Sequence, residues 1–415
     1  MVRRRIAIVG AGISGLVTAY LLQRQHEVTV FEANDYIGGH TNTVDVEGPD
    51  GHHAIDTGFI VFNPESYPNF VELLCRLDVE SQKTSMTFSV SSERSGLEYG
   101  GGGLQRMFAQ RRNLFRPAFH RMLLEIRRFY REAPELLQGD DSSTTIGEYV
   151  ERKGFSRGFL EDHLMPFGAA IWSASTPDMY AFPARFFVEF FANHGFLRLQ
   201  KPEWRVVSGG SRQYIGPLTS SFRDRIRSNT PVHRVTRTEH GVDIETRAGI
   251  EHFDEVVLAV HSDLALRLLS DPSTEETEIL SAMGYQENKV LLHTDITRLP
   301  ATRRAWSSWN YRIPKQTADQ VTVTYNMNML QGLQTAETYC VTLNECAAIN
   351  PARVLREFTY HHPRYTLESV AAQKRHDEIS GVGRTHYCGA CWGYGFHEDG
   401  VVSALQVARQ FGETL

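Results

Sequence analysis

The sequence contains no uninterrupted apolar run of about 20 residues, the length that a membrane-spanning helix requires. Its 43 basic and 49 acidic residues nearly balance, and a net charge of −6 gives no reason to expect a nucleic acid as partner. The start, MVRRR followed at once by a strand pattern, lacks the apolar core of a secretory signal. These absences favour a cytoplasmic chain of 415 residues that buries a large core in two domains. They leave its oligomeric state open.

Five cysteines are few and odd in number, which favours reduced thiols over a disulfide framework. Cys388 and Cys391 form a CxxC pair, but no two further ligands stand at a spacing typical of zinc. The pair ends an apparent strand, whereas redox dithiols usually start a helix whose dipole lowers the pKa of the first thiol. We therefore expect structural cysteines and no metal site.

What the chain does have is a glycine turn near its start. Residues 6–22 read IAIVGAGISGLVTAYLL, a short apolar strand, the turn and a helix. In the dinucleotide-binding fold the first glycine makes the turn, the second lets backbone N–H groups approach a pyrophosphate, and the third lets helix and strand pack closely. The residues expected at the cofactor are therefore Gly10, Gly12, Ile13, Ser14 and Gly15.

A second strand, residues 28–31, ends at Glu32, about 20 residues after the first glycine. A carboxylate at that position is expected to receive a ribose hydroxyl of the cofactor. No arginine stands beside it to bind a 2′-phosphate. The turn and the acid alone leave NAD and FAD as alternatives.

Strings spread over most of the chain decide between them. They are GGHTNTVDV, IDTGFIVFN, AAIWSAS, AWSSWNY, TYNMNMLQ and YCGACWGYGFHEDG. With the glycine turn, these strings resemble the bacterial predicted NAD/FAD-binding protein group within the FAD-dependent amine oxidase and phytoene desaturase superfamily. The resemblance implies FAD as cofactor and an α/β fold. That fold is a Rossmann-like FAD-binding domain of the glutathione-reductase and amine-oxidase type, with an inserted α+β substrate domain.

The resemblance also implies how the chain divides. The FAD-binding domain would be discontinuous and comprise residues 1–75, 200–265 and 381–415. The substrate-binding domain would comprise residues 76–199 and 266–380. Two distant parts of the chain would then meet around one cofactor.

Further cofactor contacts follow from the resemblance. A second glycine pair passes the pyrophosphate, a later strand meets the adenine, and a helix near the end of the chain points at the flavin carbonyl O2. The implied residues are Gly38, Gly39, His40, Thr57, Gly58, Val232, Gly389, Gly400 and Val401. This chain has His40 where the superfamily usually has arginine, so a permanent cation is replaced by a group that can be neutral at pH 7.

Aromatic residues supply the candidate substrate contacts, although the same side chains also build cores. The aromatic candidates are Phe59, Trp309, Tyr325, Trp392, Tyr394 and Phe396, and the polar Asn328 is a further candidate that could orient a headgroup. Phe396 lacks the hydroxyl of the tyrosine that is usual in amine oxidases, which disfavours an amine substrate. Lys289 and His293 are the catalytic candidates, because strand alternation places both on one face. The resemblance to amine oxidases implies that Lys289 would hold a water at flavin N5, and His293 would be a base beside Asp295 or a structural histidine.

No second strand–glycine turn–helix unit is available for NAD(P)H, so electrons arrive with the substrate or from a partner. The resulting hypothesis is an FAD-dependent two-electron oxidation or desaturation of a hydrophobic substrate. Relatives in the resembling group accompany cyclopropane-fatty-acid-synthase-like methyltransferases, which favours a methylated or cyclopropane-type fatty acyl chain. Amine oxidation, monooxygenation and isomerisation are the enzymatic alternatives. A flavin-holding lipid-binding or redox-sensor protein is the alternative without turnover.

One basic stretch, residues 104–131, holds eight arginines and one acid. Beyond Pro117 its apolar residues recur at helical spacing and form a stripe of Phe119, Met122, Leu123, Ile126, Phe129 and Tyr130. The stripe predicts a surface helix packed on the substrate domain. The alternative is an interfacial helix that makes a peripheral contact with anionic lipid at the inner face of the membrane.

Overall fold

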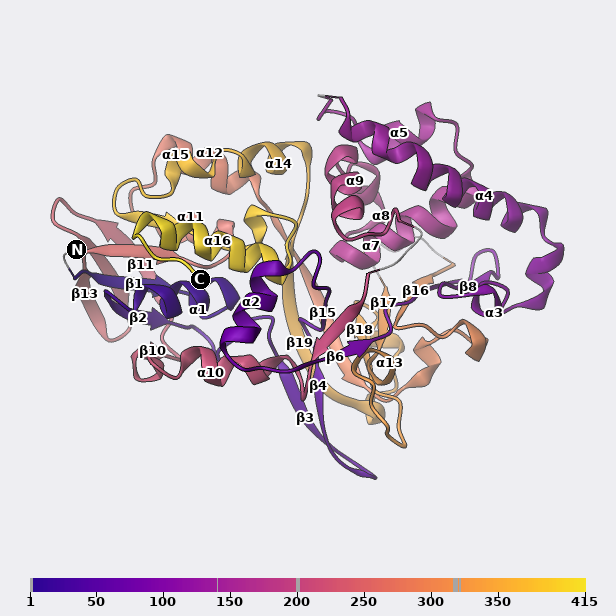
Figure 1. Cartoon of the computed structure of the whole chain (residues 1–415), viewed down its shortest axis with the longest axis horizontal. Helices are drawn as coiled ribbons and strands as arrows, with labels where there is room; N and C mark the ends of the chain where they lie inside the picture. Colours follow the sequence, from indigo (N-terminus) through magenta and orange to yellow (C-terminus); the bar gives the residue numbers. More distant parts are fainter. Residues whose placement is uncertain (1–2, 140, 199–201, 316–319, 321) are drawn as a thin grey trace.

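The computed structural model describes residues 3–139, 141–198, 202–315, 320 and 322–415. The expected boundary between residues 199 and 200 lies outside the described residues. The chain forms two halves that lie side by side, and both chain ends belong to the half on the left of Figure 1. We call this the nucleotide half and the other the substrate half.

A parallel sheet forms the centre of the nucleotide half. Its described strands are, in order, β10 (Ile226–Arg227), β2 (Glu27–Phe31), β1 (Arg5–Val9), β14 (Glu255–Leu258) and β20 (Thr385–Tyr387). Residues 6–9 are all buried, as in a strand covered on both faces. The sheet thus joins the start of the chain to β14 and to β20 near its end, and the predicted Rossmann-like α/β fold is confirmed.

Side chains of β1 alternate between two hydrophobic cores. Ile6 and Ile8 pack with one set of helices, and Ala7 and Val9 pack with the other set and a small antiparallel sheet. The first set is α1 (Ile13–Leu22), α2 (Pro68–Arg76), α10 (Ile215–Thr219) and α16 (His397–Gln410). The second set is α11 (Ser262–Leu268), α12 (Thr274–Ala282), α14 (Leu367–Gln373) and α15 (His376–Ile379), with β11 (Val232–Arg237), β12 (Val242–Thr246) and β13 (Gly249–Phe253).

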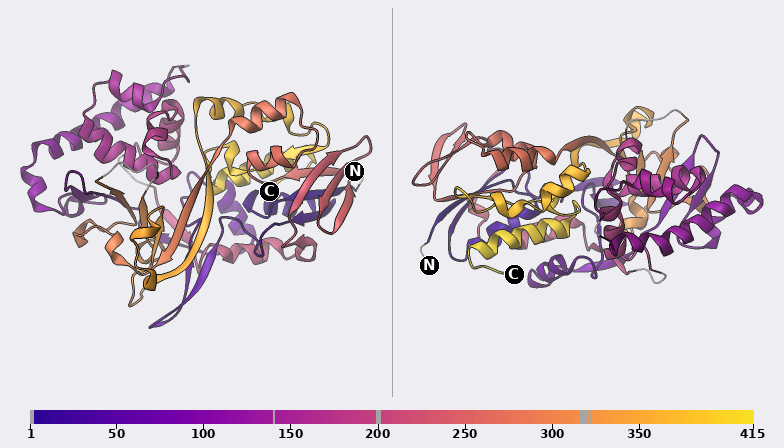
Figure 2. Two further views of the ribbon diagram at one scale, coloured as in Figure 1. Left: turned by 180° about the vertical axis from the view of Figure 1, so that it is seen from behind. Right: turned by 90° about the horizontal axis from the view of Figure 1, so that it is seen from above.

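A larger mixed sheet carries the substrate half. Its described strands are, in order, β19 (Val354–Pro363), β15 (Tyr285–His293), β18 (Cys340–Leu343), β17 (Val323–Asn326), β16 (Trp309–Ile313), β7 (Phe88–Ser92) and β8 (Glu98–Gly100). Helices pack beside it, as both figures show (Figures 1 and 2). They are α3 (Leu104–Met107), α4 (Pro117–Glu132), α5 (Ile146–Arg152), α6 (Arg157–Phe159), α7 (Met165–Trp172), α8 (Thr176–Tyr180) and α9 (Ala184–Asn193). Phenylalanines of α4, α6 and α9 fill the core between these helices.

Several strands cross between the halves. The long pair β15 and β19 runs from the substrate half to the nucleotide half (Figures 1 and 2). Helix α13 (Met327–Gln331) abuts the hairpin of β3 (Thr43–Gly48) and β4 (Gly51–Asp56), and a small sheet joins β5 (Val61–Phe62), β9 (Trp204–Val207) and β6 (Ser81–Thr84). These crossings place a cavity where the two halves meet.

The packing differs from the expected domain division at two places. Helices α12, α14 and α15 lie within the range 266–380, yet Ile279, Ala372 and Ile379 are buried in a core of the nucleotide half. The physical reason is that their apolar sides cover the open face of β14. Among the described residues, no helix is both long enough and apolar enough to cross a membrane.

Asp56 ties the β3–β4 hairpin to the segment that follows β9. Its Oδ1 accepts hydrogen bonds from the Thr43 hydroxyl at 2.6 Å and from the Ser211 N–H at 2.8 Å. Its Oδ2 is buried and has no partner among the described residues. Burial therefore raises the pKa of Asp56 to about 6, above the ordinary 3.8.

This raised pKa makes stability depend on pH. Because the folded carboxyl keeps its proton to about pH 6 and the unfolded one loses it near pH 3.8, its contribution is complete at low pH and is lost as pH rises through that window. Relative to Asp56→Asn, the wild type should lose about 2 kcal/mol of unfolding free energy between pH 4 and pH 7. Denaturant unfolding at both pH values measures this difference. The exposed control Asp224→Asn should leave the pH dependence unchanged, and a pH-independent difference for Asp56→Asn would contradict the account.

Candidate active site

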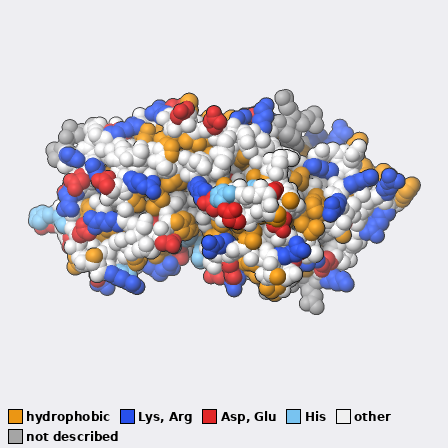
Figure 3. Space-filling view, turned by 90° about the horizontal axis from the view of Figure 1, so that it is seen from below, with side chains coloured by type: hydrophobic (Ala, Val, Ile, Leu, Met, Phe, Trp, Pro, Cys, Tyr) orange, Lys and Arg blue, Asp and Glu red, His pale blue; other side chains and the backbone are white. Residues whose placement is uncertain are grey.

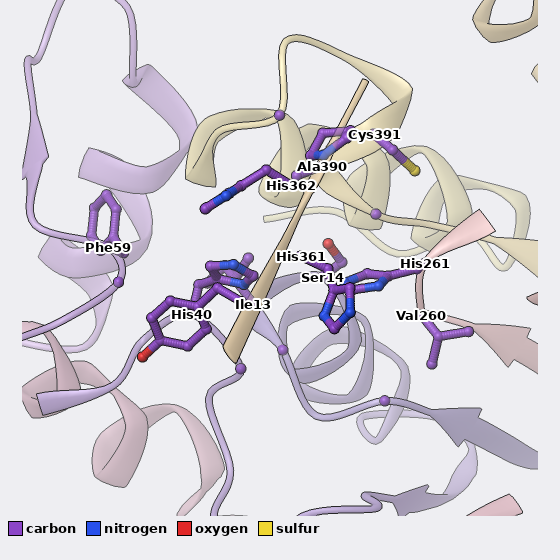
Figure 4. A pocket seen from close by; sticks show the side chains of 18 of the residues that line it. Ile13, Ser14, His40, Phe59, Val260, His261, His361, His362, Ala390 and Cys391 are labelled. Carbon is purple, nitrogen blue, oxygen red and sulfur yellow. The ribbon is translucent and has the colours of Figure 1, made fainter. Parts of the chain in front are cut away.

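A cavity of about 560 Å³ lies where the halves meet. Its walls come from the glycine turn after β1, the segments 38–40 and 57–61, the end of β14, the crossing pair β15 and β19, and residues 389–397. Figure 4 shows the side chains that converge on it. Parts of the chain that are far apart in sequence thus form one continuous wall.

Three glycines of the opening turn have distinct roles. Gly10 has a φ of +104°, and a Cβ there would lie 2.5 Å from the carbonyl oxygen of Ala259. A Cβ at Gly15 would lie 2.0 Å from the Gly10 oxygen, so Gly15 serves the close packing of α1 rather than the cavity wall. A Cβ at Gly12 would meet nothing within 4 Å and would project into the cavity.

The second glycine pair faces the first turn. The Gly38 N–H donates to the Ala11 carbonyl at 2.8 Å, and a Cβ at Gly39 would lie 3.2 Å from the Gly12 Cα. This approach leaves a cradle that is lined by backbone at the start of α1. Such a cradle offers N–H groups and the positive end of the helix dipole to a phosphate.

Glu32 ends β2 at the edge of the same cavity. Its Oε2 accepts the Ala11 N–H at 2.8 Å, and its Oε1 accepts the Asn34 backbone and side-chain N–H groups, each at 2.9 Å. These bonds fix the carboxylate beside Val232, which also lines the cavity. Oε2, which accepts only one N–H, keeps a lone pair for a ribose hydroxyl.

A group of histidines lines the middle of the cavity, where Figure 4 labels His40, His261, His361 and His362. The His40 ring lies 4.9 Å from the Tyr360 ring and 5.4 Å from the His362 ring, and its Nε2 has no partner among the described residues. Burial, with the neighbouring His362, lowers the pKa of His40 well below its ordinary value. Because neutral imidazole has one N–H donor, His40 can donate to a phosphate without a fixed charge.

His362 is held by an amide pair. The Asn288 oxygen accepts from the Asn344 amide at 2.7 Å, so the Asn288 amide donates to Nδ1 of His362 at 2.9 Å. Nδ1 is then an acceptor, and the proton of the neutral ring is on Nε2. Burial lowers the pKa values of His362 and His261 to about 4. Three imidazoles of the cavity, those of His40, His261 and His362, are therefore neutral near pH 7.

Phe59 and His397 form the far wall. Their rings stack with centroids 3.5 Å apart, and His397 is fixed by Thr41 at 2.9 Å and Tyr214 at 3.2 Å. Helix α16 begins at His397, before the predicted contact residues Gly400 and Val401. Its first free N–H groups thus belong to residues 397–399.

Gly400 and Val401, the residues predicted to contact the flavin O2, lie inside this helix and do not line the cavity. The Gly400 N–H donates to the Phe396 carbonyl at 3.1 Å, and a Cβ at Gly400 would lie 2.7 Å from Ile13. Gly400 therefore serves the contact of α16 with α1, and Val401 is fully buried in the same core. The Asp399 carboxylate accepts the Phe396 N–H at 2.9 Å and so fixes the start of α16 at the cavity.

The structure places both catalytic candidates outside the cavity. Lys289 is exposed, because its neighbour Val290 takes the cavity side of β15 and successive side chains alternate. His293 is fully buried within the sheet, where its Nε2 meets the Thr342 hydroxyl at 2.7 Å and its Nδ1 accepts the Asp295 N–H at 3.0 Å. Of the two alternatives for His293, a catalytic base or a structural histidine, these contacts favour the structural histidine.

Two of the predicted substrate contacts, Asn328 and Trp392, also lie outside the cavity. Asn328 donates to the Thr335 hydroxyl and the Glu337 carbonyl and accepts from the Tyr339 N–H, so it closes the turn after α13. Trp392 packs against His376 at 4.5 Å, away from the cavity. The other candidates are in the wall: Phe59, Trp309, Tyr325, Tyr394 and Phe396.

The remaining predicted cofactor residues line the cavity, namely Gly10, Gly12, Ile13, Ser14, Glu32, Gly38, Gly39, His40, Thr57, Gly58, Val232 and Gly389. Sequence reasoning missed His261, His361, His362, Tyr285 and Tyr360. The one signal for any of these residues is the HHP string at residues 361–363, which ends β19 and contains His361 and His362. Among the described residues, no group of histidine, cysteine and acidic side chains has the arrangement of a metal site.

A family model described as flavin-containing amine oxidoreductase matches residues 13–411. The chain belongs to this family. As a member it is an FAD-dependent oxidoreductase. The cavity fits that cofactor, because the Gly12 cradle suits its pyrophosphate, Glu32 its ribose, and the unpartnered Nε2 of His40 a phosphate oxygen.

Solved structures share the fold of this amine oxidoreductase. Putrescine oxidase bound to putrescine is 15% identical, covers 99% of each chain and has a TM-score of 0.70. Cyclohexylamine oxidase from Brevibacterium oxydans is 16% identical over 99% of this chain and 100% of that chain, with a TM-score of 0.69. The CLA-producing fatty acid isomerase from P. acnes is 17% identical over 98% of this chain and 99% of that chain, and its TM-score is also 0.69. At these identities the likeness shows the fold alone.

A curated relative matches only a short part of the chain. It is the uncharacterized protein MJ1488 of Methanocaldococcus jannaschii, 48% identical over 44 residues. The chain spans 11% of that relative's length.

The two glycines Gly12 and Gly15 separate cofactor binding from folding. Gly12→Ala should fold as the wild type does and lose at least about tenfold in FAD affinity, because the new methyl group enters the pyrophosphate cradle. Gly15→Ala should instead lower the thermal midpoint by several degrees, because its Cβ meets backbone. Scanning fluorimetry without added FAD and flavin fluorescence titration measure the two effects. Equal loss of stability in both variants would show that Gly12 is not part of a cradle.

Proposed function

We propose that this oxidoreductase removes two hydrogens from a hydrophobic acyl chain and leaves a new C=C bond. The charge content of the cavity is the observation that supports this most. Among its described lining residues Glu32 is the only acid, and none is lysine or arginine. Glu32 lies at the end of the cavity formed by β2 and Val232, where its oxygens already accept three N–H groups.

This charge content disfavours a charged substrate. An amine bound as an ammonium ion would need a carboxylate partner once it leaves water. A free fatty acid would need a cation for its own carboxylate, and the cavity has no lysine or arginine among its described lining residues, while the imidazoles of His261 and His362 are neutral. An acyl chain whose carboxyl is esterified meets neither difficulty. We therefore favour an acyl group that is still attached to a lipid, with a methyl branch or a cyclopropane ring along the chain.

The walls near Phe59 suit such a chain. Trp309 and Tyr325 pack edge to face at 5.2 Å, and Trp172 is held by its indole N–H, which donates to the Tyr394 carbonyl at 3.2 Å. Tyr394 stands beside Phe186 at 4.6 Å. Rigid aromatic walls exclude water and orient a flexible chain, which is most of what a hydride transfer asks of the protein.

The reaction balances in atoms and electrons. FAD would supply a two-electron acceptor for one hydrogen of the chain, transferred as hydride, and dioxygen or a quinone-type molecule would be the final electron acceptor. The hydrogen on the adjacent carbon would leave as a proton to an imidazole of the cavity.

A second candidate is the shift of a double bond along an acyl chain, with the hydride returned to the substrate. It is favoured by the fold shared with the CLA-producing fatty acid isomerase. Desaturation changes the mass of the acyl chain by two hydrogens, and isomerisation does not.

Anaerobic mixing of the FAD-loaded protein with candidate substrates tests the proposal. Phospholipid with methyl-branched or cyclopropane acyl chains should bleach the flavin absorbance, and the acyl chain should lose two hydrogens by mass spectrometry. Putrescine and cyclohexylamine should leave the spectrum unchanged. Bleaching by either amine, with no response to the lipids, would refute the proposed substrate class.

A variant in the aromatic wall connects the chemistry to this cavity. Ile171→Phe should slow the bleaching by acyl lipid at least about tenfold, because the added ring occupies the space meant for the chain. It should keep the flavin spectrum, since Ile171 lies in the substrate half. Ile296→Phe, on the surface, is the matched control and should react as the wild type does.

A further inference from the structure

The basic stretch 104–131 forms the outer tip of the substrate half. It comprises α3, a short turn of helix at Arg111–Phe115 and α4 (Figure 1). The predicted apolar stripe of α4 is confirmed as a packing face. Phe119, Met122 and Phe129 are at most 3% exposed and belong to the core of the substrate half. The stripe is therefore unavailable to a membrane.

A different set of apolar side chains remains in solvent. Phe115 is 87% exposed, Leu124 is 69% exposed and Leu114 is 48% exposed. Leu104 on the neighbouring α3 is 73% exposed. These four are a large share of the exposed large hydrophobic residues of the described chain, and they come from one segment of 21 residues, 104–124.

These side chains share one face with the arginines. Apart from Ala118, the exposed residues of α4 recur at 117, 120, 121, 124, 127 and 131, the spacing of a single helix face. His120 on that face bonds the Leu114 carbonyl at 2.9 Å, and its ring lies 5.9 Å from that of Phe108 after α3. The turn, the end of α3 and the outer face of α4 are thus continuous. We call this surface the tip patch.

The tip patch is strongly basic. Arg111, Arg116 and Arg127 have no ion-pair partner in the part of the chain that the structure describes. The one acid within the stretch, Glu125, is turned inward, where it is 7% exposed and accepts from Ser156 and Arg121. At the right-hand end of Figure 3, basic side chains surround hydrophobic ones.

We propose that the tip patch docks on an anionic lipid bilayer, with Leu114, Phe115 and Leu124 in the interface and the arginines against the lipid phosphates. Exposed apolar groups ringed by unpaired arginines complement a surface that is negatively charged outside and apolar within. An acidic protein would satisfy the arginines but would not explain three bulky apolar side chains that protrude among them. The proposal goes beyond the proposed reaction and stands without it, because docking needs no turnover.

Vesicle co-sedimentation of the full-length, FAD-loaded protein tests the docking. The protein should bind vesicles of phosphatidylcholine with about a third phosphatidylglycerol at least about tenfold better than phosphatidylcholine alone. High salt should weaken the binding, because it screens the arginines. The triple variant Leu114→Ser, Phe115→Ser, Leu124→Ser should lose most of the binding at any salt. The triple variant Arg111→Ala, Arg116→Ala, Arg127→Ala should lose the part that depends on salt.

A matched control lies at the opposite end of the molecule. Arg234→Ala, Arg247→Ala and Ile250→Ser alter exposed residues of β11, the β12–β13 turn and β13, and Ile250 is 67% exposed. This variant should bind vesicles as the wild type does. Flavin absorbance and thermal midpoints confirm that each variant is folded, which is expected because every substituted side chain is exposed or half-buried. No binding to anionic vesicles, or equal loss in the control, would overturn the proposal.

Discussion

The architecture depends on close approaches between backbones that only glycine permits. Gly10 touches the end of β14, Gly15 touches Gly10, and Gly39 opposes Gly12 across a cradle. A side chain at Gly10 or Gly15 would push α1 away from the sheet, and one at Gly12 would fill the space of a pyrophosphate. Because β14 and β20 are neighbours in the same sheet, these contacts also set where residues 389–397 reach the cavity.

Apart from Glu32 at one end, the described lining of the cavity is polar without an acid, a lysine or an arginine. Arginine would provide a permanent cation beside the phosphates, whereas His40 is neutral at pH 7 and is joined by His362 and His261 from other strands. Binding of a doubly negative pyrophosphate there relies on N–H donors and the dipole of α1 rather than on ion pairs. The same lack of charge extends to the aromatic walls, which is why an uncharged acyl chain suits them better than an amine.

Much of the fold and of the cofactor site could be predicted from the sequence because both depend on local patterns. The local sequence determines both the strand–turn–helix of residues 6–22 and the position of Glu32 beside this turn. Lys289 and His293, the catalytic candidates, lie outside the cavity because of a strand register that a single sequence does not reveal. The face of β15 that meets the cavity depends on its pairing with β18 and β19, and that pairing puts Val290 inside and Lys289 outside. Likewise the histidines at 361 and 362 matter only because β19 crosses between the halves.

An FAD-bound crystal structure tests the central claim most directly, which is that the two glycine pairs and the segment before α16 hold one cofactor. The account predicts the adenosine beside Glu32 and Val232, the pyrophosphate between Gly12 and Gly39 within hydrogen-bond distance of His40, and the flavin ring by Phe59 and the N–H groups that begin α16. A flavin that lies elsewhere, or a purified chain that binds no FAD at all, would contradict it.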